Sequence, residues 1–192
     1  IYATRMATLG LATTDSLLEM QKHLERAAQE LAAATVDVIA FGCTTGSLLK
    51  GVGWDQEIIK RIEAKTGVPA TTTATAVVDA LHKLNIRNLS VATPYIEELN
   101  KKEVEFLEGH GFKVVKIKGL GLIKGIGDNS PEVAYRLARE VDVEEADGIF
   151  ISCTNFAWCV SNMAKDTNQP TMSKEKQIGF HIGALTTLAM ER

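Results

Sequence analysis

A short apolar run that ends in Cys-Thr occurs twice in this chain. Asp37 stands six positions before Cys43 in the first copy, and Asp147 stands six positions before Cys153 in the second. Each copy is followed by a helix-like stretch and then by an extended segment that contains a proline. We interpret this pattern as a duplicated half-site. If the two halves face each other, two thiols flank one small substrate, which is the arrangement that a cofactor-free isomerase or racemase needs.

Hydrophobic periodicity divides the rest of the chain into alternating helices and strands. Apolar residues at helical spacing predict helices over residues 15–34, 55–65, 74–84, 97–109, 131–141 and 179–190. Apolar runs predict strands over residues 36–41, 88–93, 113–118 and 148–152. The run at 36–41 is continuous, which is typical of a strand buried on both faces. Strands that alternate with helices predict βαβ units and a mostly parallel sheet.

The repeat predicts an α/β fold with two pseudo-symmetric Rossmann-like lobes. Each lobe is expected to have a mostly parallel sheet flanked by helices, with the active site in the cleft between the lobes. We expect the first lobe to comprise residues 1–73 and 174–192, and the second to comprise residues 74–173. In open α/β sheets the carboxyl ends of the strands face the ligand. Cys43 and Cys153 both follow such ends, so their position is the one expected for a site.

Composition excludes several classes of function. The hydrophobic share of 45% and the charged share of 23% are ordinary for a soluble domain. A net charge of −3, with scattered lysines and arginines, gives no positive field for nucleic acid. No apolar run has the 18 or so residues of a membrane span, and no Cys/His cluster has metal-ligand spacing. We therefore expect a cytoplasmic protein that binds neither nucleic acid nor membrane nor metal.

In a reducing compartment, all three cysteines are expected to be free thiols. A thiol has a pKa of about 8.5, and backbone N–H groups at the start of a helix can lower it. Small hydroxyl-bearing residues follow Cys43 and Cys153 and can hold the acid group of a substrate. The alternatives are that each cysteine is a small buried hydrophobic residue, or that the two form a redox pair. Cys159 has no matching copy, so packing is its expected role.

Four short pieces of sequence together resemble a known family. They are Cys43-Thr44-Thr45-Gly46-Ser47, Thr93-Pro94-Tyr95, Asn129 and Cys153-Thr154-Asn155. As a set they resemble the maleate cis-trans isomerase branch of the Asp/Glu racemase superfamily, which also includes arylmalonate decarboxylases. The resemblance extends from Ala3 to about Pro170.

The resemblance implies a cofactor-independent enzyme that acts on a small carboxylic acid. In such isomerases the first cysteine attacks the double bond of the substrate and the second assists proton transfer, which assigns these roles to Cys43 and Cys153. A tyrosine and an asparagine bind a carboxylate, which assigns that role to Tyr95 and Asn129. The remaining expected substrate-binding residues are Thr44, Thr45, Thr154 and Asn155.

We therefore predict a maleate-isomerase-like enzyme. An amino-acid or hydantoin-type racemase with two-base cysteine chemistry is the alternative within the same class, and a non-catalytic protein that binds small acids is the alternative outside it. A decarboxylase of this superfamily typically keeps only the second cysteine, so Cys43 argues against that activity. The family usually opens with a strand and an asparagine-bearing loop, whereas this chain begins at Ile1. Either the sequence is incomplete at its start or this first strand is absent. We also expect the protein to be a homodimer.

Overall fold

The computed structural model describes residues 1–156 and 177–179. The first part of the chain contains α1 (Thr14–Met20), the 3-10 helix η1 (Gln21–His23), α2 (Leu24–Ala32), β1 (Ile39–Phe41), α3 (Thr44–Leu48), α4 (Trp54–Thr66) and β2 (Ala70–Thr72). The second part contains α5 (Thr73–Lys83), β3 (Asn88–Thr93), α6 (Glu97–Gly109), β4 (Lys113–Gly119), the 3-10 helix η2 (Ile126–Asp128), α7 (Pro131–Val141), β5 (Gly148–Ile151), the 3-10 helix η3 (Thr154–Phe156) and β6 (Gln177–Gly179). None of the helices in these ranges combines the length and the apolar character that crossing a bilayer requires.

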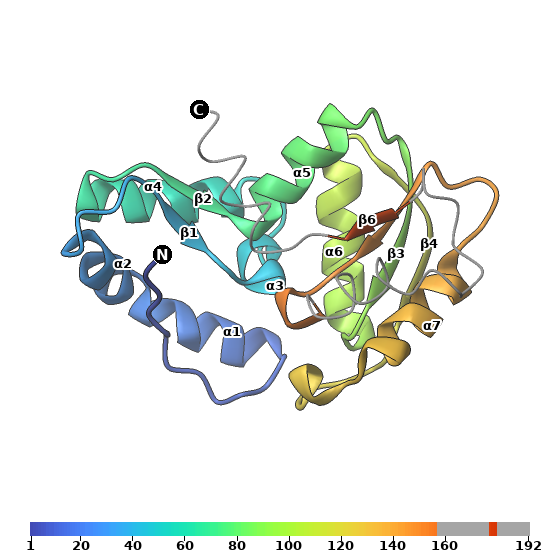
Figure 1. The fold of residues 1–192 in the computed structure, drawn as a ribbon, viewed down its shortest axis with the longest axis horizontal. Coiled ribbons are helices and arrows are strands. Elements are labelled where there is room, and N and C mark those ends of the chain that lie inside the picture. The colour runs from blue at the N-terminus through green and yellow to red at the C-terminus, as the bar shows by residue number, and fades with distance from the viewer. Residues whose placement is uncertain (157–176, 180–192) are drawn as a thin grey trace.

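Two parallel sheets organise the molecule (Figure 1). β1 pairs with β2 in a two-stranded sheet, and the order of the four-stranded sheet is β4-β3-β5-β6. The predicted α/β class with parallel strands is confirmed. β6 pairs with β5 in the second sheet, although residues 174–192 were expected in the first lobe. The lobe boundaries stay a prediction, and the helix expected over 179–190 lies outside the described residues except for Gly179, which ends β6.

The strands follow from the burial that each position requires. All four residues of β5 are buried, as are five of the six residues of β3, because helices cover both faces of this sheet. β1 is shorter than the strand predicted over 36–41, because it pairs only with the three residues of β2. Val36 and Val38 are only partly buried and lie outside that pairing.

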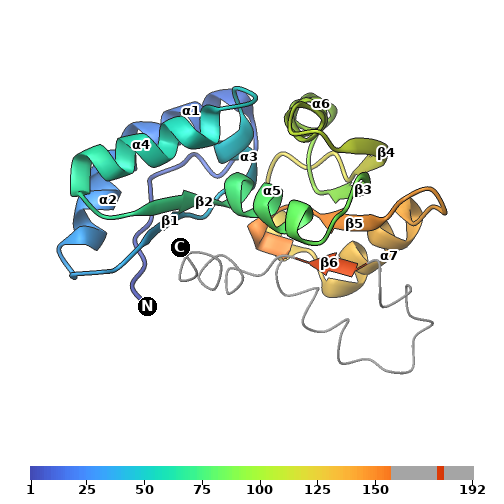
Figure 2. The same cartoon turned by 90° about the horizontal axis from the view of Figure 1, so that it is seen from above.

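Three apolar clusters hold the helices against the sheets. α5 and α6 contribute Val77, Leu81 and Phe106 to a cluster on one face of the four-stranded sheet, whereas α7 contributes Leu137 and Val141 to a cluster on the other face. Figure 2 shows α6 and α7 on opposite sides of this sheet. The third cluster surrounds the two-stranded sheet and is the one that reaches the site described below.

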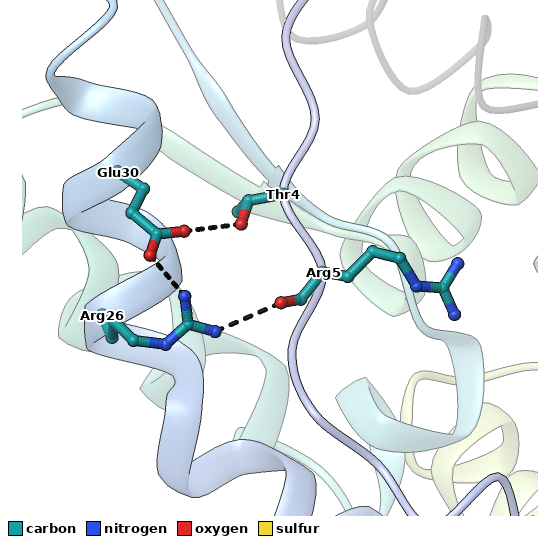
Figure 3. A network of polar contacts seen from close by, with 4 residues as sticks. All are labelled: Thr4, Arg5, Arg26 and Glu30. Atoms are coloured by element: carbon teal, nitrogen blue, oxygen red, sulfur yellow. Dashed lines mark hydrogen bonds and ion pairs between the residues drawn. The ribbon is translucent and has the colours of Figure 1, made fainter.

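The segment that precedes α1 is fastened to α2 by a polar network (Figure 3). The Thr4 hydroxyl donates a 2.6 Å hydrogen bond to Glu30, which also forms an ion pair with Arg26. Arg26 donates a second hydrogen bond, of 3.1 Å, to the carbonyl of Arg5. The hydrogen bonds from Thr4 and Arg26 hold the pKa of the Glu30 carboxyl below its usual value. The Arg5 side chain itself points away from this network.

Candidate active site

The two repeated cysteines occupy equivalent positions in the two sheets. Cys43 lies two residues after β1 and immediately before α3, and Cys153 lies two residues after β5 and immediately before η3. Both are free and partly exposed. Both also pack against the same apolar cluster, to which Tyr95 belongs, and the charge of one thiol acts on the other. The structure thus brings Cys43, Cys153 and Tyr95 together at the carboxyl ends of their strands.

A tight turn positions the Cys43 thiol. The backbone N–H of Gly46 interacts with the sulfur, and a methyl group added at Gly46 would lie 3.0 Å from Sγ. The carbonyl of Gly46 accepts hydrogen bonds from Gln21 Nε2 at 2.6 Å and from Trp54 Nε1 at 3.2 Å. The Ser47 hydroxyl donates to the carbonyl of Cys43 at 2.8 Å. These contacts fix the peptide that faces the thiol, and glycine is the residue that leaves room for it.

Cys153 occupies a strained backbone position. Its backbone angle φ is +96°, in a region that residues other than glycine rarely adopt. The Tyr95 hydroxyl and the backbone N–H of Asn155 both interact with the sulfur in a way that favours the thiolate. Strain of this kind persists only where the surroundings enforce it, and it concentrates at functional sites.

Tyr95 follows β3 and is held in place through its backbone. Its side chain is 2% exposed. Its backbone N–H donates to the Thr93 hydroxyl at 3.2 Å, and that hydroxyl in turn donates to Asn100 on α6 at 2.5 Å. Burial raises the pKa of the Tyr95 phenol well above its usual value, and the neighbouring Cys153 raises it further. The phenol therefore keeps its proton and acts as a hydrogen-bond donor.

The helix-start N–H groups lower the thiol pKa values as expected, but burial raises both values by more, so that each thiol pKa lies above its ordinary value. Burial raises the pKa of the Cys43 thiol, and it does so by more than the Gly46 N–H and the Thr45 hydroxyl lower it. Burial likewise raises the pKa of Cys153 to about 11, despite the bonds from Tyr95 and Asn155. The physical reason is that loss of hydration opposes the charged thiolate more than a few donors favour it.

The residues expected to bind substrate are distributed around the two cysteines. Thr44 and Thr45 are buried in α3, Thr154 is partly exposed, and Asn155 is exposed. Asn129 follows η2, which contacts η3, but its amide donates hydrogen bonds to the carbonyls of its own turn. Only Tyr95 and the Thr45 hydroxyl have a described side-chain interaction with a cysteine. Substrate binding by the whole set stays a prediction.

Two buried polar residues near the site were missed from the sequence. Gln21 is 4% exposed and holds the turn at Cys43, whereas Glu103 is completely buried on α6 and acts electrostatically on Cys153 and Tyr95. The sequence offered one signal for them, which is hydrophobic periodicity. Each of the two residues occupies a position in its own helical stretch at which apolar residues recur. A polar residue inside such a stripe indicates a special environment.

Of the two repeated aspartates, Asp147 lies away from the cysteines. Asp147 precedes β5 and accepts hydrogen bonds from the backbone N–H groups of Arg87 and Asn88, so it joins the amino ends of β5 and β3. A hollow of about 340 Å³ lies near the same end of the sheet and is lined by His82, Asn85, Ile86, Arg87, Gly111 and Phe112. The hollow is therefore at the amino ends of the strands, whereas the two cysteines follow the carboxyl ends. Within residues 1–156 and 177–179, no group of three or more His, Cys, Asp or Glu side chains is arranged to hold a metal ion.

Comparison with known proteins finds maleate isomerases and an arylmalonate decarboxylase that are similar to this chain. The maleate isomerase of Geobacillus stearothermophilus is 23% identical over 158 residues, which are 79% of this chain and 62% of that protein. The arylmalonate decarboxylase of Bordetella bronchiseptica is 27% identical over 144 residues, which are 72% of this chain and 58% of that protein. The matched region thus spans about three fifths of the length of these relatives.

A solved structure supports the fold. A mutant of the Nocardia farcinica maleate cis-trans isomerase, with a covalently bound succinylcysteine intermediate, superposes with a TM-score of 0.84 at 21% identity. The superposition covers 99% of this chain and 80% of the isomerase. The profile of one protein family, described as arylmalonate decarboxylase, matches residues 3–186. The resemblance noted from the sequence is confirmed, and the chain belongs to the arylmalonate decarboxylase family.

Proposed function

We propose that this protein is a cofactor-independent isomerase that interconverts the cis and trans forms of a small dicarboxylic acid of the maleate type. Cys43 is the nucleophile, and Cys153 donates and removes a proton. The observation that carries the proposal is the meeting of two free cysteines with one buried tyrosine at the ends of β1, β5 and β3. The maleate isomerases among the relatives support the same substrate class.

Thiolate addition explains how two cysteines are sufficient for this reaction. After the Cys43 thiol has released its proton to solvent, its thiolate forms a bond to one carbon of the electron-poor double bond, and the Cys153 thiol delivers its proton to the other carbon. The former double bond is now single, so the intermediate rotates about it. Cys153 then takes a proton back while the bond between Cys43 and carbon breaks, which regenerates both groups. Covalent catalysis thus replaces one high rotation barrier by lower ones.

The environments of the two thiols suit these roles. The Cys153 pKa of about 11 keeps the proton on this thiol at neutral pH, as a proton donor requires. The Gly46 N–H and the Thr45 hydroxyl lower the pKa of Cys43 from the value that burial alone would give. These two donors face the sulfur that must become a thiolate.

Negative charge that develops on the activating carboxylate requires fixed donors. The Tyr95 phenol is a suitable donor because its raised pKa keeps it protonated. In the proposal it acts with the hydroxyl, amide and backbone N–H groups of Thr44, Thr45, Asn129, Thr154 and Asn155.

Proton NMR of a solution of maleate and the protein tests the proposal. We expect the olefinic signal of maleate to be replaced by that of fumarate. Cys43→Ser should lower the rate by at least about a thousandfold, because a serine hydroxyl is a far weaker nucleophile, and Cys153→Ser should lower it by roughly a hundredfold or more, as expected for loss of a general acid.

Cys159→Ser is the matched control, because it removes a thiol that has no role in the proposal. This variant should convert maleate at nearly the wild-type rate. Absence of fumarate with the wild-type protein, or undiminished conversion by Cys43→Ser, would contradict the isomerase assignment.

Racemisation is a second candidate, which the electrostatic contact between two thiols favours. One cysteine would remove an α-proton and the other would return a proton from the opposite face. Incubation with amino acids or hydantoins in heavy water distinguishes the two, since racemisation exchanges the α-hydrogen and maleate isomerisation does not involve such substrates.

The expected homodimer and the cytoplasmic location also remain proposals.

A further inference from the structure

Helix α6 carries a buried acid that the proposed reaction does not use. Glu103 is 0% exposed and packs among apolar neighbours on the inner face of α6, including Leu99, Phe106 and Leu107. Among the described residues, neither of its carboxyl oxygens has a hydrogen-bond partner of ordinary geometry. A buried acid in such surroundings is costly to keep charged. Its position in the fold indicates which residues it supports.

The inner face of α6 supports the two strand ends that carry Tyr95 and Cys153. One turn before Glu103, Asn100 accepts a hydrogen bond from Thr93, which holds the backbone of Tyr95. Residues three apart on a helix lie on the same face. Glu103 lies beside the hydroxyl of Ser152, a completely buried residue that immediately precedes Cys153. Asn100 and Glu103 therefore reach the ends of β3 and β5 respectively.

The electrostatic effects of Glu103 also connect it to Tyr95 and Cys153. Its charge raises the pKa of both Tyr95 and Cys153. Of the elements in contact with α6, α3 has no ionisable side chain and the lysines of β4 are exposed. Burial and the Ser152 hydroxyl shift the pKa of Glu103, and no ionisable side chain of the described residues, including those of α1, α4 and α5, does so. Among the described residues, Tyr95 and Cys153 are thus the ionisable groups that Glu103 influences from behind the site.

We propose that Glu103 is a positioning residue which supports Ser152 and Cys153 from behind the site, and that its ionisation regulates the second cysteine. The inference rests on the proposed function for its effect on turnover, but its effect on the thiol is independent of any substrate. When Glu103 is neutral, its carboxyl can donate to or accept from the Ser152 hydroxyl. When it is charged, it opposes formation of the thiolate at Cys153 and of the phenolate at Tyr95.

The pH range of this effect follows from the burial of Glu103. Burial raises the pKa of its carboxyl to about 7, and the Ser152 hydroxyl offsets part of that rise. The carboxyl is therefore mostly neutral in mildly acidic solution and mostly charged in mildly alkaline solution. A charge that appears across this range slows the increase of Cys153 thiolate as the pH rises further.

Alkylation of the native protein by iodoacetamide, followed by mass spectrometry of the separate cysteine peptides, tests this dependence. The Glu103→Gln variant keeps the size and hydrogen-bonding capacity of the side chain but cannot ionise. At about pH 8.5 we expect Cys153 of this variant to react roughly threefold to tenfold faster than in the wild type, whereas at about pH 6 the two should agree within about twofold. Cys43 should show no such pH-dependent ratio.

Glu105→Gln is the matched control, since it removes the same charge from an exposed position of α6. This variant should leave both labelling profiles unchanged. A ratio for Glu103→Gln that is equal at the two pH values, or that changes equally at both cysteines, would overturn the inference. Either result would mean that Glu103 acts only on the packing of the protein.

Turnover separates the positioning role from the electrostatic one. Glu103→Leu is neutral like Glu103→Gln but cannot bond to Ser152. If the protein isomerises maleate, Glu103→Leu should lower kcat roughly tenfold with little change in KM, and Glu103→Gln should restore it. Equal kcat values in the two variants would contradict positioning through Ser152. If the wild type does not convert maleate, the proposed function fails, and the labelling experiment still decides the role of Glu103.

Discussion

Burial controls the ionisation of the residues at this site. It is the largest cause of the raised pKa of Cys43, Cys153, Tyr95 and Glu103. The two thiols and the phenol are therefore neutral at neutral pH before a substrate binds. If the proposed function holds, an incoming dicarboxylate meets hydrogen-bond donors and no thiolate charge that would repel it. In that proposal, binding comes first and ionisation of Cys43 follows.

The buried Glu103 also makes stability depend on pH. Its pKa is about 7 in the folded protein and about 4.5 in the unfolded chain, so the folded state binds more protons between these values. The free energy of unfolding should therefore fall as the pH rises through this range, by roughly 3 kcal/mol. Glu103→Gln should remove that dependence: it should match the wild type at about pH 4.5 and be more stable by up to roughly 3 kcal/mol at about pH 8.

Urea unfolding at the two pH values measures this difference. The exposed Glu105→Gln serves again as the control and should show no comparable difference between the two conditions. A stability gain of Glu103→Gln that is the same at both pH values would indicate a packing effect in place of ionisation.

At the scale of elements, the ends of β3 and β4 determine where Tyr95 lies. Pairing between these strands continues past their ends, because Leu120 N–H donates to the Thr93 carbonyl at 3.0 Å and Gly121 N–H donates to the Tyr95 carbonyl at 3.1 Å. Gly119 lies at the centre of this junction. A methyl group added there would lie 2.4 Å from the Tyr95 carbonyl oxygen and 2.4 Å from Asn100 Nδ2.

Gly119→Ala should therefore destabilise the protein by roughly 1–3 kcal/mol, since the backbone of the Tyr95 segment must shift to admit the methyl group. Urea unfolding measures the loss. Gly127→Ala is the control, because a methyl group at Gly127 meets no described atom within 4 Å. If the two variants lose the same stability, close packing at the end of β4 is not what requires glycine.

At the scale of the whole molecule, one apolar cluster joins the two sheets. Leu99 of α6 and Tyr95 pack with residues of α1 and α4, such as Leu17, Ile58 and Ile62. The hydroxyl of Thr14 at the start of α1 also donates a hydrogen bond to Glu98 on α6. Cys43 and Cys153 both pack against this cluster, so a change in its packing is expected to change how they lie relative to one another.

Leu99→Ala should lower the stability of both parts of the molecule together. Leu99 is 0% exposed, so its truncation should decrease the free energy of unfolding by roughly 2–5 kcal/mol. In a Trp158→Phe background, fluorescence reports on Trp54 of α4, whereas circular dichroism reports on all helices. The two signals should shift to the same lower urea concentration. A shift confined to the circular dichroism would show that the two sheets unfold separately.

Much of the fold could be predicted because its signals are local. The predicted bounds 88–93, 97–109 and 131–141 coincide with β3, α6 and α7. Pro94 ends the first of these, and Ser130-Pro131 begins the last. β2 was predicted only as an extended segment and η2 was not predicted, because a three-residue strand and a single 3-10 turn leave no periodic pattern. The existence of β2 depends on its pairing with β1, which is distant in the sequence.

The candidate site was only partly visible in the sequence. The duplicated Asp-x5-Cys-Thr pattern identified Cys43 and Cys153 because equivalent strand ends repeat equivalent residues. Gln21 and Glu103 were missed because their roles depend on contacts with Gly46 and Ser152, far along the chain. No local pattern encodes such contacts.

The sequence by itself determined the class of the fold, the parallel strands and the two thiols at strand ends, since these depend on periodicity and on residue types that act within a few positions. Only the tertiary structure decided the ionisation of those thiols and the buried groups that support them. The reason is that hydration is lost through packing of the whole molecule, and this loss outweighs the donors that the local sequence supplies.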